Sequence, residues 1–185
     1  MGFGESFPSV LQACRLGGEW AWRELYEDLA PAVLRYLRAC GAPEPEDVLG
    51  DTFLSVVQGL GGFEGEERDF RAWVFTIARS RLIDDARNRA RRPALPMPLE
   101  DITGFGGAGD VETEAFDSLA EGRVRRIIES LTPEQRDVLL LRILVDLTIE
   151  QIAAVLGKRP GAVKALQARG LEAIRRAMAT GAVTF

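Results

Sequence analysis

Basic side chains gather in two short parts of the sequence, and phosphate binding is the chemistry that they suit. Residues 68–92 contain eight arginines and three aspartates, and residues 156–176 contain six basic residues and one acid. Between them, residues 93–122 contain seven acids and no base. The net charge of the chain is −5, but a local basic patch matters more than total charge for contact with a polyanion. The two patches therefore predict binding to nucleic acid.

Side chains that could support catalysis are few. The chain has no histidine, the commonest general base, and Cys14 and Cys40 are not spaced as zinc ligands. We expect these two cysteines to be free thiols, with a disulfide as the alternative. The acids that a metal-dependent enzyme could use are Asp47, Asp51, Asp84 and Asp85. They lie on predicted helices without a histidine or a phosphate-binding loop, so we expect no enzyme activity, no metal and no cofactor.

The second basic patch lies on a pair of predicted helices. Thr148 and Gln151 have the spacing of a capping box, Gly157 suits a left-handed helix end, and Pro160 suits the first position of the next helix. Two helices joined by a tight glycine-containing turn, the second of them basic, are typical of a helix-turn-helix. An ordinary helical hairpin with solvated charges is the alternative. The residues expected on the buried side of the second helix are Val163, Leu171, Ile174 and Met178.

The rest of the chain is also predicted to be helical, since no segment alternates with a period of two. Apolar stripes predict helices over residues 9–40, 47–60 and 70–92. Pro31 should kink or break the first of these. The polar, glycine-rich residues 62–68 should form a loop.

The stretch at residues 93–111 is rich in proline and glycine and predicts a flexible acidic linker. Helical pattern resumes over residues 112–129. Thr132, Pro133 and Gln135 then predict the capped start of a further helix. The predicted fold is all-α, with two small helical domains, residues 1–92 and 112–185, joined by the linker.

Three blocks of sequence, in a fixed order, resemble one known family. They read "PEDVLGDTFLSVVQGLGGF", "FRAWVFTIARSRLIDDARNRARR" and "LTPEQRDVLLLRILVDLTIEQIAAVLGKRPGAVKALQARGLEAIRR". The chain thereby resembles a bacterial extracytoplasmic-function (ECF) sigma factor over about residues 20–178. The resemblance implies a sigma factor that binds core RNA polymerase, through its β′ and β subunits, and directs promoter recognition and transcription initiation. It also implies promoter DNA and an anti-sigma factor as partners.

The resemblance assigns a role to each block. The first would dock on polymerase, the second would open and read the −10 promoter element, and the third would read the −35 element. The polymerase-binding residues implied are Asp47, Gly50, Asp51 and Leu54. Those implied at the −10 element are Phe63, Arg68, Arg71, Arg79, Ser80 and Arg87. Those implied at the −35 element are Arg159, Pro160, Ala162, Lys164, Ala165, Leu166 and Arg169.

Two aromatic residues near the second block have alternative interpretations. Phe63 is the stacking candidate in the loop, but an aromatic there would serve equally well as an anchor to the core. Trp73 is expected to be core rather than a wedge that melts DNA. The main alternative for the whole chain is a free-standing helix-turn-helix regulator, which would not need the arginine-rich second block. The sequence has no segment that predicts a signal peptide or a membrane span, so we expect a cytoplasmic protein that is not inserted in a membrane.

Overall fold

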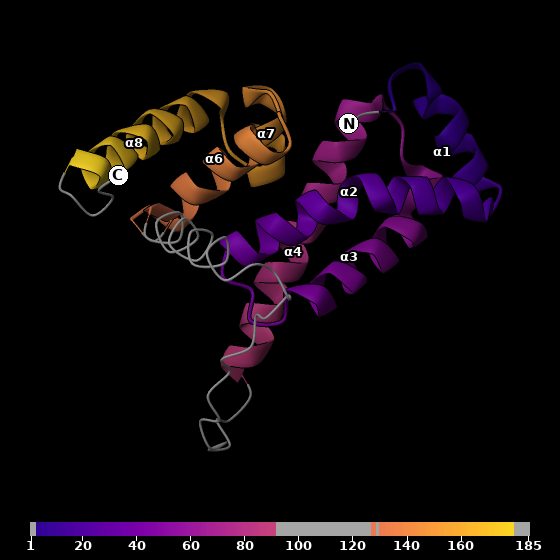
Figure 1. Cartoon of the computed structure of the whole chain (residues 1–185), viewed down its shortest axis with the longest axis horizontal. Coiled ribbons are helices and arrows are strands. Elements are labelled where there is room, and N and C mark those ends of the chain that lie inside the picture. Colours follow the sequence, from indigo (N-terminus) through magenta and orange to yellow (C-terminus); the bar gives the residue numbers. More distant parts are fainter. Residues whose placement is uncertain (1–2, 92–126, 129, 180–185) are drawn as a thin grey trace, which may run out of the picture.

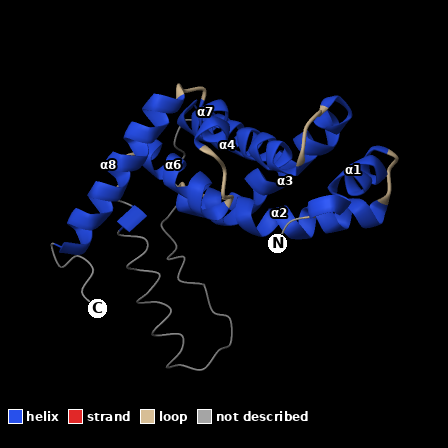
Figure 2. Cartoon of the chain, turned by 90° about the horizontal axis from the view of Figure 1, so that it is seen from above, coloured by secondary structure: helices blue, strands red, loops and turns tan. Residues whose placement is uncertain are grey.

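A computed structural model of the protein describes residues 3–91, 127–128 and 130–179. Within these ranges every regular element is a helix, as Figures 1 and 2 show, which confirms the all-α fold class. None of the described helices is long and apolar enough to cross a membrane. The elements in chain order are η1 (Gly4–Ser6), α1 (Phe7–Arg15), α2 (Glu19–Ala39), α3 (Pro45–Gly59), η2 (Leu60–Gly62), α4 (Glu67–Arg91), α6 (Pro133–Leu144), α7 (Ile149–Leu156) and α8 (Pro160–Ala179).

The first predicted helix is divided, but not at the expected place. The chain leaves α1 and turns at Gly17, whose φ of 80° is a left-handed conformation that favours glycine. In contrast, α2 continues through Pro31. Of the predicted kink or break at Pro31, the break is therefore wrong, and the kink stays a prediction. Burial of one face of α2, including Leu29 and Val33, stabilises the helix on both sides of the proline.

The N-terminal helices α1–α4 enclose a core rich in aromatic residues. The largest fully buried side chains there are Leu25, Tyr36, Phe70 and Phe75. The ring centroids of Tyr36 and Phe75 are 5.5 Å apart, in the edge-to-face arrangement that aromatic pairs prefer. This packing joins α2 to α4 and fixes the helix that carries the first basic patch.

The C-terminal helices begin and end where their local sequence predicts. Thr132 and Thr148 each form a complete capping box with the glutamine three residues later. Gly157 ends α7 with a φ of 62°, and Pro160 begins α8. A methyl group on Gly170 would lie 2.9 Å from Cδ1 of Leu139, so this glycine permits the close approach of α8 to α6.

The expected buried side of α8 is partly wrong. Leu171 and Met178 are 38% and 41% exposed, whereas Val163 and Leu166 are almost completely buried. The helix is therefore rotated so that Val163, Leu166 and Gly170 face α6 and α7. Val57, expected in the apolar stripe of α3, is likewise 51% exposed.

The two groups of helices pack against each other. Both figures place α6–α8 together beside α1–α4, and α7 contacts α4 while α6 contacts α2. The expected linker, residues 93–111, and most of the helical pattern at 112–129 lie outside the described residues. The boundaries of the two domains, 1–92 and 112–185, therefore stay a prediction.

Candidate nucleic-acid interface

The start of α8 presents a basic face to solvent. Arg159, Lys164 and Arg169 are exposed, as are the small residues Ala162 and Ala165 and the first helical residue, Pro160. The opposite face is fixed by burial of Val163 against the core. This arrangement leaves the cations of the first turns available for phosphate groups and the alanines available for close approach.

Leu166 does not belong to this exposed face. It was expected among the −35 contacts, but only 6% of its surface is exposed and it lies in the hydrophobic core with Val163 and Ile152. We correct the expectation, because a side chain that is three residues from Val163 shares its buried side of the helix. Lys158, beside the expected contacts, pairs with Glu134 at 2.6 Å.

The arginines of α4 divide into exposed and engaged groups. Arg68 and Arg87 are exposed, as is Ser80 on the same helix, and Arg87 pairs with Asp84 at 3.7 Å. Arg79 is engaged, since its Nε donates to Asp137 of α6 at 3.0 Å. Arg71 is also engaged, with Asp28 and Glu67. Arg68 and Arg87 are therefore more accessible to a phosphate than Arg71 and Arg79, whose acidic partners are largely buried.

The loop before α4 is held by its aromatic residue. Phe63 is 7% exposed, and its ring lies 5.1 Å from that of Phe70 and 5.3 Å from that of Trp73. Its side chain anchors the loop in the core, so we correct the expectation that it stacks on a base. Trp73 packs against the same core, in agreement with its expected role.

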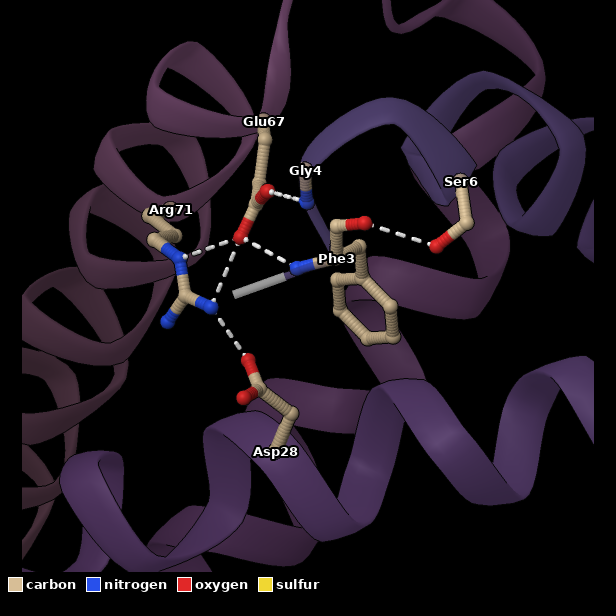
Figure 3. A network of polar contacts seen from close by, with 6 residues as sticks. All are labelled: Phe3, Gly4, Ser6, Asp28, Glu67 and Arg71. Atoms are coloured by element: carbon tan, nitrogen blue, oxygen red, sulfur yellow. Dashed lines mark hydrogen bonds and ion pairs between the residues drawn. The ribbon is translucent and has the colours of Figure 1, made fainter. Parts of the chain in front are cut away.

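A polar network joins the start of α4 to the beginning of the chain (Figure 3). The Glu67 carboxylate accepts hydrogen bonds from the backbone N–H groups of Phe3 at 3.1 Å and Gly4 at 2.8 Å. It also accepts from Nε of Arg71 at 3.1 Å, and the Arg71 guanidinium donates in turn to Asp28. Burial acts to raise the pKa of Glu67, but the hydrogen bonds from Arg71, Gly4 and Phe3 together hold the pKa below its ordinary value.

One face of α3 combines acids with apolar side chains. Asp47, Gly50, Asp51 and Leu54 are all placed there, and Leu54 is 61% exposed. The structure adds Val57 and Tyr26, which are 51% and 46% exposed; the ring of Tyr26 lies 4.7 Å from that of Phe53 on α3. Sequence reasoning missed both, although the spacing of three residues from Leu54 to Val57 was a usable signal.

Acids and cysteines are side chains in the described part of the chain that could bind a metal or act as a nucleophile. No cluster of three or more potential metal ligands occurs there. Both cysteines are free thiols, as expected. Burial raises the pKa of Cys14 to about 11 and that of Cys40 to about 12, so neither is a thiolate nucleophile at neutral pH.

Comparisons with known proteins match both halves of the chain. Residues 25–92 match the Sigma-70 region 2 family, and residues 121–174 match the Sigma-70 region 4 family. The ECF RNA polymerase sigma factor SigD of Mycobacterium tuberculosis is 30% identical over 178 residues, which cover 93% of this chain and 84% of SigD. The chain belongs to the ECF sigma factors. Members of this family are promoter-recognition subunits of RNA polymerase and not enzymes.

Other ECF sigma factors agree in sequence and in fold. BldN of Streptomyces coelicolor is 32% identical over 174 residues, 90% of this chain, and the chain spans 64% of its length. The structure of CnrH in complex with the cytosolic domain of CnrY has a TM-score of 0.69 at 23% identity and covers 95% of this chain and 99% of that one. The sigma factor RpoE in complex with the anti-sigma factor NepR from Bartonella quintana has a TM-score of 0.63 at 18% identity, with 85% and 96% covered. These two structures support the fold.

The sigma-factor matches can be placed on the helices. The region 2 match contains α3, the loop and α4, and the region 4 match contains α6, α7 and most of α8. The helix α1 precedes both matches, although it packs into the same core through Phe7 and Val10.

Proposed function

We propose that this ECF sigma factor binds core RNA polymerase through α3 and directs transcription initiation by reading a −10 element with α4 and a −35 element with α8. The observation that carries the proposal is the separation of two unlike surfaces on one chain. The face of α3 is acidic and apolar, whereas the first turns of α8 are basic and exposed.

The α3 face has the composition of a protein interface. A specific interface combines an apolar centre with a polar rim, and Leu54 and Val57 are flanked by Asp47 and Asp51 on one side of the helix. An exposed acid repels the phosphates of DNA, so this face suits polymerase. We assign it to the β′ subunit, with the β subunit as a second contact of the protein.

The two DNA surfaces differ in what they offer. At the −35 element, Arg159, Lys164 and Arg169 would position α8 on the phosphates while Ala162 and Ala165 face the bases. At the −10 element, Arg68, Ser80 and Arg87 would contact the opened strand, and Arg79 and Arg71 would join them once they leave their acidic partners. An opened strand needs cations along its backbone and a pocket for an unstacked base.

The family likeness also supports a regulator and a location. CnrH and RpoE are seen with CnrY and with the anti-sigma factor NepR respectively. We assign this chain an anti-sigma factor of its own and a place in the cytoplasm, where polymerase and promoters are found.

Run-off transcription tests the proposal. Core RNA polymerase is incubated with a pool of genomic promoter fragments, with and without the protein, and discrete new start sites are expected only when both proteins are present. Leu54→Asp should lower the affinity for core polymerase by at least about tenfold, as loss of an interface hot spot does. Met178→Asp, at an exposed position near the end of α8, is the matched control.

The alternative has its own outcome. Binding of a specific duplex without polymerase, together with no new start sites, would favour the free-standing helix-turn-helix regulator. Equal binding of polymerase by the Leu54→Asp and unsubstituted proteins would overturn the docking role of α3.

A further inference from the structure

The beginning of the chain folds onto the loop that precedes α4. The ring of Phe7 on α1 lies 5.6 Å from that of Phe70, and Phe7 is 3% exposed. The ring of Phe3 is 6.3 Å from that of Phe7. Residues 3–15 precede the region 2 match, which begins at residue 25. A segment outside the family match therefore forms one wall of the structure that supports the loop.

The last residue of α1 fixes the middle of the loop. The Arg15 guanidinium donates a hydrogen bond to the backbone carbonyl of Phe63, while the Phe63 ring packs in the core on Phe70 and Trp73. Phe63 is thus held at two points, its ring and its carbonyl. Rotation of the peptide that follows Phe63 would break the Arg15 contact without disturbing the ring.

The far end of the loop is held by acids. Asp69 accepts from the backbone N–H of Glu66 at 3.1 Å, and Glu67 binds the N–H groups of Phe3 and Gly4 (Figure 3). Gly65, between these points, has a φ of 145°, a conformation that side chains rarely adopt. The loop is therefore held at Phe63, in its middle, and at Glu66, at its far end.

Burial of Phe63 changes what the loop can offer to a base. Its exposed residues are Gly61, Gly62, Glu64, Gly65 and Glu66, and the three glycines among them can offer only backbone groups. Backbone N–H and C=O groups have fixed directions, and recognition of a base edge by them depends on where the peptide planes lie. The contact that orients the Phe63–Glu64 peptide then also orients the recognition surface.

We propose that Arg15 is a positioning residue for the loop of residues 61–66 and that it sets which base this loop accepts at the −10 element. The inference rests on the proposed function, in which the opened −10 strand needs a pocket for an unstacked base, and it places that pocket at the loop. It adds α1 to the unit that reads the promoter. Arg15 does not touch DNA in this proposal; it acts through the Phe63 carbonyl.

The test compares Arg15→Gln, Arg15→Lys and the unsubstituted protein at full length. Arg35→Gln is the matched control, because Arg35 is an exposed arginine whose Nε donates to a carbonyl of its own helix, that of Pro31. Each protein is assayed with core polymerase on a promoter whose −10 bases are varied one at a time. Arg15→Gln should change the ratio of initiation between the best and second-best base at one position by about fivefold, the lower end of what a mismatched pair costs.

Two further readouts distinguish orientation of the loop by Arg15 from a general effect of Arg15 on the stability of the fold. Amide hydrogen exchange should become faster at residues 61–66 in Arg15→Gln and stay unchanged in α6–α8. Arg15→Lys, which keeps a cationic donor, should restore part of the base preference. Arg35→Gln should behave as the unsubstituted protein does in both assays.

The outcomes distinguish this inference from the proposed function. Initiation by Arg15→Gln that is uniformly lower, or unchanged, with the original base preference would overturn the role of Arg15 alone. Absence of new start sites with the unsubstituted protein and polymerase would overturn the proposed function, and this inference with it. A changed preference in Arg35→Gln as large as that in Arg15→Gln would also overturn the inference.

Discussion

Charge at single positions distinguishes the part of α8 that we propose binds DNA. Lys164 and Arg169 are exposed on the same helix as Arg175, but Arg175 lies farther along the helix and pairs with Glu172 at 3.6 Å. Phosphate contacts release counterions, and each contact adds about one to the slope of affinity against salt. The slope of log affinity against log salt concentration therefore measures how many cationic side chains contact the phosphates of promoter DNA.

We expect Lys164→Ala and Arg169→Ala each to weaken binding of promoter DNA by the protein with core polymerase. The slope of log affinity against log salt concentration is negative, and its magnitude should decrease by about one for each change. Arg175→Ala should leave the slope unchanged and serves as the control. Titrations at several salt concentrations measure this, and an unchanged slope in both test variants would remove α8 from the phosphate contacts.

The protonation of the Glu67 carboxylate makes the free energy of unfolding depend on pH. Its pKa in the folded protein is held below the ordinary value of 4.5. The contribution of Glu67 to the free energy of unfolding is therefore present above pH 4.5 and is lost as the pH falls through the folded-state pKa. Glu67→Gln should lower the free energy of unfolding at pH 7 by about 1.5–3 kcal/mol, the size of a hydrogen bond to a charged group.

The difference between Glu67→Gln and the unsubstituted protein should shrink as the pH falls from about 5 to about 3. Urea unfolding at a series of pH values measures it. Glu64→Gln, at an exposed glutamate in the loop before α4, is the control. A constant difference at all pH values would mean that the glutamine acts by packing and not by loss of charge.

At the scale of the helix, α3 contains two glycines with opposite surroundings. A methyl group on Gly50 would meet nothing within 4 Å, whereas one on Gly59 would lie 2.8 Å from Cζ2 of Trp73. Gly50→Ala should raise the free energy of unfolding by about 1 kcal/mol, because alanine favours a helix interior. Gly59→Ala should lower it by about 1–3 kcal/mol, because the indole ring must move.

Thermal or urea unfolding of the two variants checks this pair. The indole of Trp73 also packs on Phe63, so Gly59→Ala should change tryptophan fluorescence while Gly50→Ala should not. Equal effects of the two substitutions would contradict the packing of α3 on α4. Gly50 also lies in the proposed docking face, so Gly50→Ala reports on polymerase binding without destabilising the fold.

Features that depend on a few neighbouring residues could be predicted from the sequence. The capping boxes at Thr132 and Thr148 and the left-handed Gly157 are set by local geometry, and all three are confirmed. Features that depend on the packing of distant helices could not. The burial of Leu166 in place of Leu171 depends on α6 and α7, and the continuity of α2 through Pro31 depends on the core that covers it.

The candidate site shows the same division between local and distant effects. The exposure of Lys164 and Arg169 follows from their spacing relative to the buried Val163. The burial of Phe63 and the engagement of Arg79 do not follow from spacing. They depend on α4, α1 and α6 coming together, which no short stretch of sequence encodes.

At the scale of the whole molecule, Asp137 of α6 joins the two groups of helices. It accepts hydrogen bonds from the hydroxyl of Tyr36 at 3.0 Å and from Nε of Arg79 at 3.0 Å. The side chain of Asp137 is 14% exposed, so the contact is largely removed from water. Farther along the interface, the Gln151 amide donates to Asp69 at 3.4 Å. The described structure is thus a closed arrangement in which an arginine proposed for the −10 element serves an internal contact.

B-DNA advances about 34 Å in one helical turn, so two promoter elements can lie well apart along the duplex. We therefore expect the closed arrangement to oppose binding to both elements at once. Asp137→Asn keeps the size of the side chain and an acceptor for Tyr36 but removes the charge that holds Arg79. Loss of the charge should weaken the closed form by about 1 kcal/mol. The radius of gyration of the free protein, measured by small-angle X-ray scattering, should therefore increase.

Asp137→Asn should strengthen promoter binding although it weakens the closed form. A protein whose competent form is only partly populated binds with reduced affinity, so weakening the closed form by about 1 kcal/mol should strengthen promoter binding with polymerase by about fivefold. Asp146→Asn is the matched control, since Asp146 is exposed and pairs with Arg142 four residues away. If Asp137→Asn expands the protein but leaves promoter affinity at the level of Asp146→Asn, opening of the two halves does not limit binding. If neither quantity changes, Asp137 does not hold the halves together.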